Sequence, residues 1–161
     1  MSLPIDIVDL LQKPDLLEAI AGRIWNAWRM REGLESQDVV QKFIDILASE
    51  AEFTLVAHRR DKFVGTTSVV TSDLPERSNL TPWVAEVWVE PEFRRHRIGS
   101  RLLEAAEMRA FNAGRRALYL YCTPPLRPFY SGNGWTEIEQ GVGKDNVCIF
   151  RKNKISGDVL T

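Results

Sequence analysis

The chain has 161 residues, 44% of them hydrophobic, and its 21 Lys and Arg residues nearly balance 22 Asp and Glu residues. This length suits one domain with a substantial core, so we expect a single domain over residues 1–161, with a frayed tail at 153–161. The formal net charge of -1 gives no overall attraction to nucleic acid or to an anionic membrane, and we expect neither as a partner.

Targeting and metal-binding signals are weak. The N-terminal segment has acidic residues where a secretory signal has basic ones, and no apolar run approaches the roughly 20 residues that a membrane span needs. Cys122 and Cys148 lack the Cys/His spacing of a zinc site and do not suggest a disulfide framework. We therefore expect a soluble, cytoplasmic protein without a metal ion.

The first half of the chain combines helices and strands. Apolar residues at three- and four-residue spacing predict helices over residues 15–30 and from Ser36 onward. Two β-rich runs, 53–57 and 63–70, are joined by a polar hairpin, and Gly65 in the second indicates a bulge or a close backbone approach. The polar, proline-containing segment 71–82 predicts a surface loop, a kind of segment that often carries function.

Residues 83–103 form the most informative stretch. A short apolar strand is broken by Pro91, and an arginine-rich turn around Gly99 leads into an amphipathic helix. A helix N-terminus offers unpaired N–H groups and a partial positive charge, and guanidinium groups add donors that match phosphate. The stretch therefore predicts phosphate binding.

The second half continues with a strand over 117–122, a short helix through Tyr130 and two closing strands over 135–139 and 147–152. The element order is helix, helix, three strands, long helix, strand, short helix and two strands. This order predicts an α/β (α+β) fold with a mixed, mostly antiparallel sheet. The strands on either side of the long helix should form a parallel pair.

Two motifs resemble one known family. The segment EVWVEPEFRRHRIGSRLL, residues 86–103, resembles the acetyl-CoA-binding motif of the GNAT superfamily of N-acetyltransferases, and FYSGNGW, residues 129–135, resembles its second signature. Motifs and element order together cover about 15–152. The resemblance implies a GNAT-like sheet whose parallel pair is splayed at the cofactor site, flanked by about four helices. It also implies acetyl transfer from acetyl-CoA without a metal.

By resemblance, the pantetheine arm of the cofactor lies along Val87, Trp88 and Val89 and pairs with backbone groups of the two valines. The pyrophosphate would rest on the turn that follows, which consists of Arg94, Arg95, His96, Arg97, Ile98, Gly99 and Ser100. The family's turn normally has a glycine where this chain has Arg97. An arginine there must adopt an unstrained backbone or direct its side chain outward, and it could contact phosphate itself, so we expect binding to persist.

The catalytic candidates are Tyr130 and Glu86. Tyr130 occupies the position of the family's usual general acid; the alternative is a core tyrosine whose hydroxyl is satisfied locally. A backbone N–H near Val87 can polarise the carbonyl. Glu86 is the candidate base if partial burial raises its proton affinity; the alternatives are a solvated strand-end carboxylate and an ordered water path. Glu90 and His58 are expected to be solvent-exposed.

The acceptor side is encoded less clearly. The resemblance places Trp28 and Arg29 from the first helix region, and Asp73 and Glu76 from the long loop, over the acceptor cleft. The acidic pair suits a cationic amine. In contrast, Arg29, Arg31 or Arg77 suits a substrate carboxylate, so the signs conflict. Trp25 and Trp28 have a three-residue spacing that is more typical of core packing.

The predicted function is transfer of an acetyl group from acetyl-CoA to a primary amine of a small molecule, by direct attack in a ternary complex. The alternatives are a peptide or protein N-acetyltransferase and a catalytically weak acyl-CoA-binding sensor module. Nucleic-acid binding through the arginine turn is disfavoured because the basic residues are confined to one turn. The resemblance allows a homodimer, for which the strand at 147–152 would offer an edge.

Overall fold

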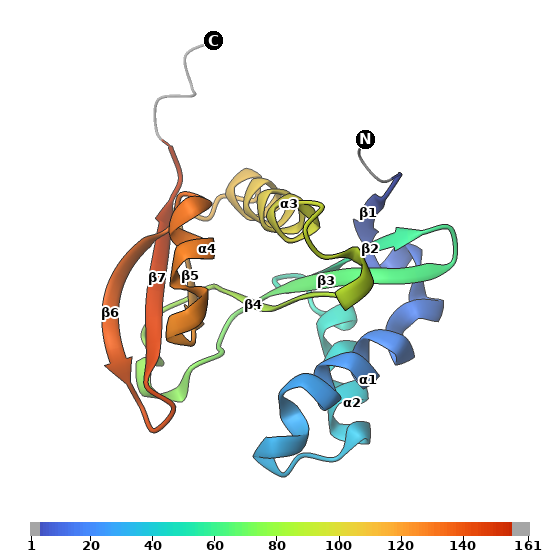
Figure 1. Ribbon diagram of the computed structural model, residues 1–161, viewed down its shortest axis with the longest axis horizontal. Coiled ribbons are helices and arrows are strands. Elements are labelled where there is room, and N and C mark those ends of the chain that lie inside the picture. Colours follow the sequence, from blue (N-terminus) through green and yellow to red (C-terminus); the bar gives the residue numbers. More distant parts are fainter. Residues whose placement is uncertain (1–3, 156–161) are drawn as a thin grey trace.

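The computed structural model describes residues 4–155, apart from the side chain of Arg31. The described chain forms a seven-stranded sheet flanked by helices (Figure 1). The strands are β1 (Asp6–Asp9), β2 (Phe53–Arg59), β3 (Lys62–Val70), β4 (Trp83–Val89), β5 (Ala117–Cys122), β6 (Thr136–Val142) and β7 (Val147–Asn153). The α-helices are α1 (Leu17–Ala27), α2 (Ser36–Ala48), α3 (Ile98–Asn112) and α4 (Arg127–Gly132).

The sheet has the order β1-β2-β3-β4-β5-β7-β6. Every neighbouring pair is antiparallel except β4 and β5, which are connected through α3 and run parallel. The predicted mixed, mostly antiparallel sheet with one parallel pair is therefore confirmed. Because β7 lies between β5 and β6, the prediction that it offers a free edge is wrong; the sheet ends at β1 and β6.

Helices cover both faces of the sheet, with α3 on one face and α1 and α2 on the other (Figure 1). On α3, Ile98, Leu102 and Leu103 are fully buried, as their helical spacing predicts. On α2, Phe43 is fully buried against the opposite core. Each face thus has its own apolar layer, and the strands are held between the two layers.

The secondary-structure predictions made from local sequence patterns failed mainly at the ends of helices and strands. Sequence reasoning missed β1, a four-residue strand with two aspartates that is stabilised by pairing with β2. The helix predicted over 15–30 is shorter, because its two ends form 3-10 turns at Pro14–Leu16 and Arg29–Glu32. Asn153, assigned to a frayed tail, pairs with Ala117, and residues 156–161 of that tail lie outside the described residues.

Two polar residues predicted to be exposed are buried. His58 is 7% exposed, and its Nδ1 lies 2.7 Å from the Arg60 carbonyl oxygen. Glu90 is 6% exposed and accepts hydrogen bonds from Arg23 Nε at 2.6 Å and from Trp88 Nε1 at 2.9 Å. His58 is buried because β2 lies between β1 and β3. Glu90 is buried because packing brings it Arg23, a partner 67 residues away.

Gly65 confirms the prediction of a close backbone approach. A Cβ at this position would lie 2.7 Å from the Trp88 carbonyl oxygen on β4, so only glycine lets β3 come this near. Within residues 4–155, no helix combines the length and apolar content that a membrane span requires.

Candidate active site

The centre of the sheet opens between β4 and β5. These parallel strands pair only where Trp83 meets Tyr119, and Tyr119 N–H donates to the Pro82 carbonyl at 3.0 Å. Beyond that point they diverge, so the β5-facing edge of β4 lacks a strand partner as far as Val89. An unpaired strand edge of this kind can accept an extended ligand as if it were another strand.

A β-bulge re-aims the side chains of β4 at this opening. The register with β3 shifts so that Glu86 and Val87 both face Thr67, and Glu86 has the left-handed φ of 58°. A bulge inserts an extra residue and commonly occurs beside active sites. After the bulge, Val87 and Val89 pack toward the α3 core and Trp88 toward the α1 and α2 core.

The turn after β4 presents free backbone donors. Among the described residues, no acceptor bonds the N–H groups of residues 95–100. Arg95 and Arg97 have left-handed φ angles of 68° and 62°, and such residues direct successive N–H groups to one side of the backbone. The turn ends at the N-terminus of α3, whose dipole favours an anion.

The side chains of Arg94, Arg95, His96 and Arg97 are all exposed, whereas Ile98 is buried under α3. Arg94 Nε donates to the Val89 carbonyl oxygen at 2.8 Å, and its guanidinium lies 4.9 Å from the ring centre of Trp88. This arginine therefore fixes the turn against the end of β4, while the side chains at 95–97 remain available.

The two alternatives for Arg97 can now be separated. Its backbone keeps a left-handed conformation with a φ of 62°, so an unstrained backbone is not the solution. Its side chain is exposed, as the outward alternative requires. A left-handed backbone costs a residue with a side chain about 1 kcal/mol, so the turn retains its shape at some cost in stability. Gly99 has a separate role, because a Cβ there would lie 3.3 Å from the Phe129 ring.

Tyr130 lies on α4 next to the apolar layer under α3. It is 7% exposed, and its ring contacts Phe129 edge-on at a centroid distance of 5.0 Å. Within residues 4–155 the only buried side-chain oxygen or nitrogen without a partner is Glu86 Oε2. The Tyr130 hydroxyl, for which the described residues offer no hydrogen bond, is therefore not sealed in the core. Burial, and secondarily Cys122, raises the pKa of Tyr130.

Glu86 is buried among cations rather than partly solvated. Its side chain is 3% exposed, and its Oε1 accepts hydrogen bonds from Arg29 Nη2 at 2.6 Å and from Lys42 Nζ at 2.5 Å. Burial by itself would lower the pKa of Arg29, but Glu86 and Glu32 outweigh it and raise that pKa. The alternative of a solvated strand-end carboxylate at Glu86 is thus wrong, whereas its role as a base stays a prediction. Sequence reasoning also missed Lys42.

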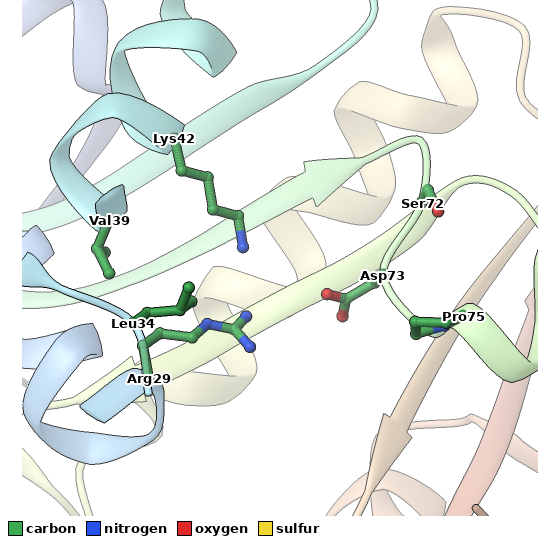
Figure 2. A pocket seen from close by; sticks show the side chains of 7 residues that line it. All are labelled: Arg29, Leu34, Val39, Lys42, Ser72, Asp73 and Pro75. Atoms are coloured by element: carbon green, nitrogen blue, oxygen red, sulfur yellow. The ribbon is translucent and has the colours of Figure 1, made fainter. Parts of the chain in front are cut away.

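A cavity of about 300 Å³ lies beside this cluster, and we name it the Asp73 cavity (Figure 2). It is lined by Arg29, Leu34, Val39, Lys42, Ser72, Asp73 and Pro75. Figure 2 shows the side chains of Arg29, Lys42 and Asp73 converging on one space from the first helix region, α2 and the long loop. The arrangement can hold a small polar molecule against a partly apolar wall.

Asp73 differs from the other charged residues of the cavity because it has no ion-pair partner within residues 4–155. Burial raises the pKa of Asp73 to about 6; Lys42 lowers it and Glu86 raises it further. Tyr121 on β5 lies near the same carboxylate, and burial followed by Asp73 raises the pKa of Tyr121 to about 12. Sequence reasoning missed Tyr121, although the alternation in ALYLYC places it on the face opposite Leu120.

The other predicted acceptor residues do not line the cavity. Glu76 lies outside it, with its carboxylate against Gly143 in the β6–β7 turn. Trp28 is 38% exposed and packs edge-on against Trp88, with ring centres 5.8 Å apart. Arg77 pairs with Glu139 on β6. The structure therefore brings together Arg29, Asp73 and Glu86, and separates Glu76 from them.

A metal site does not emerge from the part of the chain that the structure describes. Among those residues, no group of three or more His, Cys, Asp or Glu side chains is placed to hold a metal ion.

Comparison with protein families gives one match, to a model described as the acetyltransferase (GNAT) family, over residues 17–135. None of the curated proteins matches the chain significantly.

Solved structures share the fold at low sequence identity. An aminoglycoside 6'-acetyltransferase type Ii is 19% identical, with a TM-score of 0.72 over 95% of this chain and 98% of that chain. An aminoglycoside 6'-N-acetyltransferase complexed with coenzyme A is 16% identical, with a TM-score of 0.71 over 93% and 97%. An acetyltransferase of the GNAT family from Staphylococcus aureus Mu50 is 18% identical, with a TM-score of 0.70 over 92% and 98%. These likenesses concern the fold.

Proposed function

This protein belongs to the GNAT family of acetyltransferases, and from that premise we propose that it transfers an acetyl group from acetyl-CoA to a primary amine of a small molecule. Both substrates would be bound together, and the amine would attack directly. The observation that carries this proposal is the row of free N–H groups at residues 95–100, placed directly after a strand with an open edge.

The residues present fit acetyl-CoA, which supplies the thioester-bound acetyl group. The open edge of β4 at Val87 and Val89 would pair with the pantetheine arm, and Trp88 between them supports the strand from the other face. The free amides of the turn would hold the pyrophosphate, and the exposed side chains at 95–97 would add donors and positive charge. Arg97 would thereby compensate in charge for the glycine that it replaces.

The chemistry requires a polarised carbonyl and a proton for the departing thiolate. The Val87 N–H, at the bulge, is the proposed donor to the carbonyl oxygen. Tyr130 is the proposed general acid, because a tyrosine phenol is protonated at neutral pH and its hydroxyl has no other partner in the described chain. A positioned acid of this kind typically contributes about 10²–10⁴-fold to the rate.

The attacking amine must also lose a proton. Asp73 is a better proposed acceptor for it than Glu86, because Asp73 has no ion pair in the described chain while Glu86 Oε1 already accepts from two cations. A carboxyl group with a pKa of about 6 is mostly ionised at neutral pH and can take up a proton directly or through water.

The size of the Asp73 cavity, about 300 Å³, supports a small acceptor. Two proteins of similar fold are named for acetylating aminoglycosides, which are small molecules. A peptide N-terminus is the other acceptor to include in an assay.

The test is release of the coenzyme A thiol from acetyl-CoA in the presence of a panel of small amines and peptides, with mass spectrometry of the products. We expect amine-dependent release and a product heavier by one acetyl group. Tight acetyl-CoA binding without amine-dependent release, together with no effect of Tyr130→Phe, would overturn the enzyme assignment and favour a sensor module. Acetylated peptides without acetylated small amines would favour the peptide alternative.

A further inference from the structure

The charges around the Asp73 cavity are not balanced. Its two cations, Arg29 and Lys42, both bind the same oxygen of Glu86, and Arg29 also pairs with Glu32 at 3.0 Å. Asp73 has no cation partner within the described residues. The positive charges are therefore already used, and a substrate carboxylate would have to compete with Glu86 for them. The sequence left open whether the acceptor is a cationic amine or carries a carboxylate, and this charge distribution favours a cationic amine.

Glu86 supplies the second sign of a missing ligand. Its Oε2 is buried and, alone among such side-chain atoms within residues 4–155, has no hydrogen-bond partner. Leaving a buried polar atom without a donor is unfavourable. Since Arg29 and Lys42 both donate to Oε1, a ligand could supply the missing hydrogen bond to Oε2.

Lys42 is the partner that an incoming cation can displace. Its side chain is 34% exposed, compared with 13% for Arg29, so it can move into solvent at less cost. Displacement of Lys42 would open the Glu86 carboxylate toward the cavity and leave Arg29 in place as its fixed counter-ion.

A second cavity of about 390 Å³ adjoins the first, because Lys42 and Ser72 line both. We name it the Asp45 cavity. It contains Asp38, Asp45 and Glu52, none of which has an ion pair within the described part of the chain. Neutral donors hold each carboxylate in place; Gln41 Nε2, for example, donates to Asp45 Oδ1 at 2.8 Å. The two cavities thus meet at Lys42, and each contains at least one carboxylate that lacks an ion pair in the described chain.

We infer that the acceptor is an elongated di- or oligoamine. One ammonium binds at Asp73 and Glu86, where it displaces Lys42, and a second occupies the Asp45 cavity. This inference rests on the proposed function for the identity of the first amine as the reacting one, but the binding mode can be tested without turnover.

The test compares three ligands that differ only at one end: pentylamine, 1,5-diaminopentane and 5-aminopentanoate. Dissociation constants are measured by calorimetry at pH 7.5 with the protein saturated with coenzyme A, so that no acetyl transfer occurs. We expect the diamine to bind about tenfold more tightly than the monoamine, since hydrogen bonds to charged groups have that strength. The amino acid should bind most weakly. Equal binding of diamine and monoamine, tightest binding of the amino acid, or no binding of any ligand would overturn the inference.

The Lys42→Met variant distinguishes a Lys42 that competes with the ligand for Glu86 from a Lys42 that binds a substrate carboxylate. If Lys42 competes with the ligand for Glu86, its removal tightens diamine binding by about two- to fivefold, the strength of a screened charge pair. If Lys42 instead binds a substrate carboxylate, the variant weakens binding of 5-aminopentanoate and leaves the diamine unchanged, which would overturn the inference.

Asp45→Asn should raise the dissociation constant of the diamine about threefold and leave that of pentylamine unchanged. Glu104→Gln, an exposed residue of α3 on the opposite face of the sheet, is the control for the change in net charge. Equal effects of Asp45→Asn and Glu104→Gln on the diamine would show that the Asp45 cavity is not used. Failure of the proposed function would appear separately: acetyl-CoA would release no thiol, while the diamine would still bind more tightly than the monoamine and the amino acid most weakly.

Discussion

Two buried glutamates on opposite faces of the sheet have opposite hydrogen-bonding states. Glu107 on α3 uses both oxygens, accepting from Lys152 Nζ at 2.7 Å and from Trp135 Nε1 at 3.0 Å. Glu86 on β4 has two cations on one oxygen and none on the other. Both side chains are buried and both are ion-paired, so burial and pairing do not distinguish them. They differ in whether both carboxylate oxygens have hydrogen-bond partners, and this difference coincides with the proposed roles, structural for Glu107 and substrate binding for Glu86.

The same contrast extends to their surroundings. Around Glu107, Lys152 Nζ also donates to the Asn133 carbonyl at 2.9 Å, so the network ties α3 to α4 and β7. Near Glu86, Asp73 has no ion pair within the described chain. Elsewhere in the described chain, the Tyr130 hydroxyl and the amides of 95–100 also have no hydrogen-bond partner. Polar groups whose hydrogen bonds are all satisfied within the chain stabilise the fold. Polar groups without such partners lie where substrates are proposed to bind.

The largest expected effect is on catalysis. Tyr130→Phe should lower kcat about 100-fold, within the usual range for loss of a general acid. The free energy of unfolding should stay within about 0.5 kcal/mol of the parent, because the described chain offers the hydroxyl no hydrogen bond. Steady-state kinetics and urea unfolding measure the two quantities. A large loss of stability with unchanged kcat would show that Tyr130 stabilises the fold, as Glu107 is expected to, and does not take part in catalysis.

The direct comparison uses Glu107→Gln and Glu86→Gln. The first removes the anion beside Lys152 and should lower the free energy of unfolding by about 2 kcal/mol, without changing KM for the amine. The second should raise that KM about tenfold and cost less stability, since Lys42 can turn into solvent. Similar profiles for the two variants, measured by urea unfolding and steady-state kinetics, would remove the distinction between them.

Asp73 allows a test by pH. Its pKa is raised from 3.8 to about 6 by burial, so the folded state holds the proton more tightly than the unfolded state. The charged carboxylate therefore opposes folding, an effect absent below pH 3.8, growing as the pH rises to about 6 and complete above it. Asp73→Asn should raise the free energy of unfolding by about 2 kcal/mol at pH 7.5, after allowance for solvent screening.

At pH 4 the same substitution should have little effect on stability. Urea unfolding at both pH values provides the measurement, and Asp145→Asn in the exposed β6–β7 turn is the control. Stabilisation that is equal at pH 4 and pH 7.5 would contradict the assignment of a raised pKa. Loss of amine binding together with a gain in stability would be the signature of a residue kept for function.

The smallest expected effect concerns the turn. Arg97→Gly relieves the left-handed backbone and should be about 1 kcal/mol more stable than Arg97→Ala, which keeps the strain. Both variants lose the guanidinium, so both should raise KM for acetyl-CoA by the same factor, about threefold. Unequal KM values would mean that backbone shape, rather than charge, limits binding at this position.

Much of the fold and the proposed donor side could be predicted from the sequence because the signals are local. Alternation and helical spacing within single segments predicted most strands and helices, and residues 86–103 and 129–135 carried the family resemblance. The short strand β1 escaped because two aspartates conceal it and only its pairing with β2 stabilises it.

The proposed acceptor side depended on tertiary structure. Glu86 meets Arg29 and Lys42 across 57 and 44 residues of chain, and no local periodicity encodes such a meeting. The same packing moved Glu76 to the β6–β7 turn and brought Tyr121 toward Asp73. Sequence by itself determined the family, the class of sheet and the position of the turn proposed to bind phosphate, because these follow from neighbouring residues. Which charges remain unpaired was decided only when distant segments packed together.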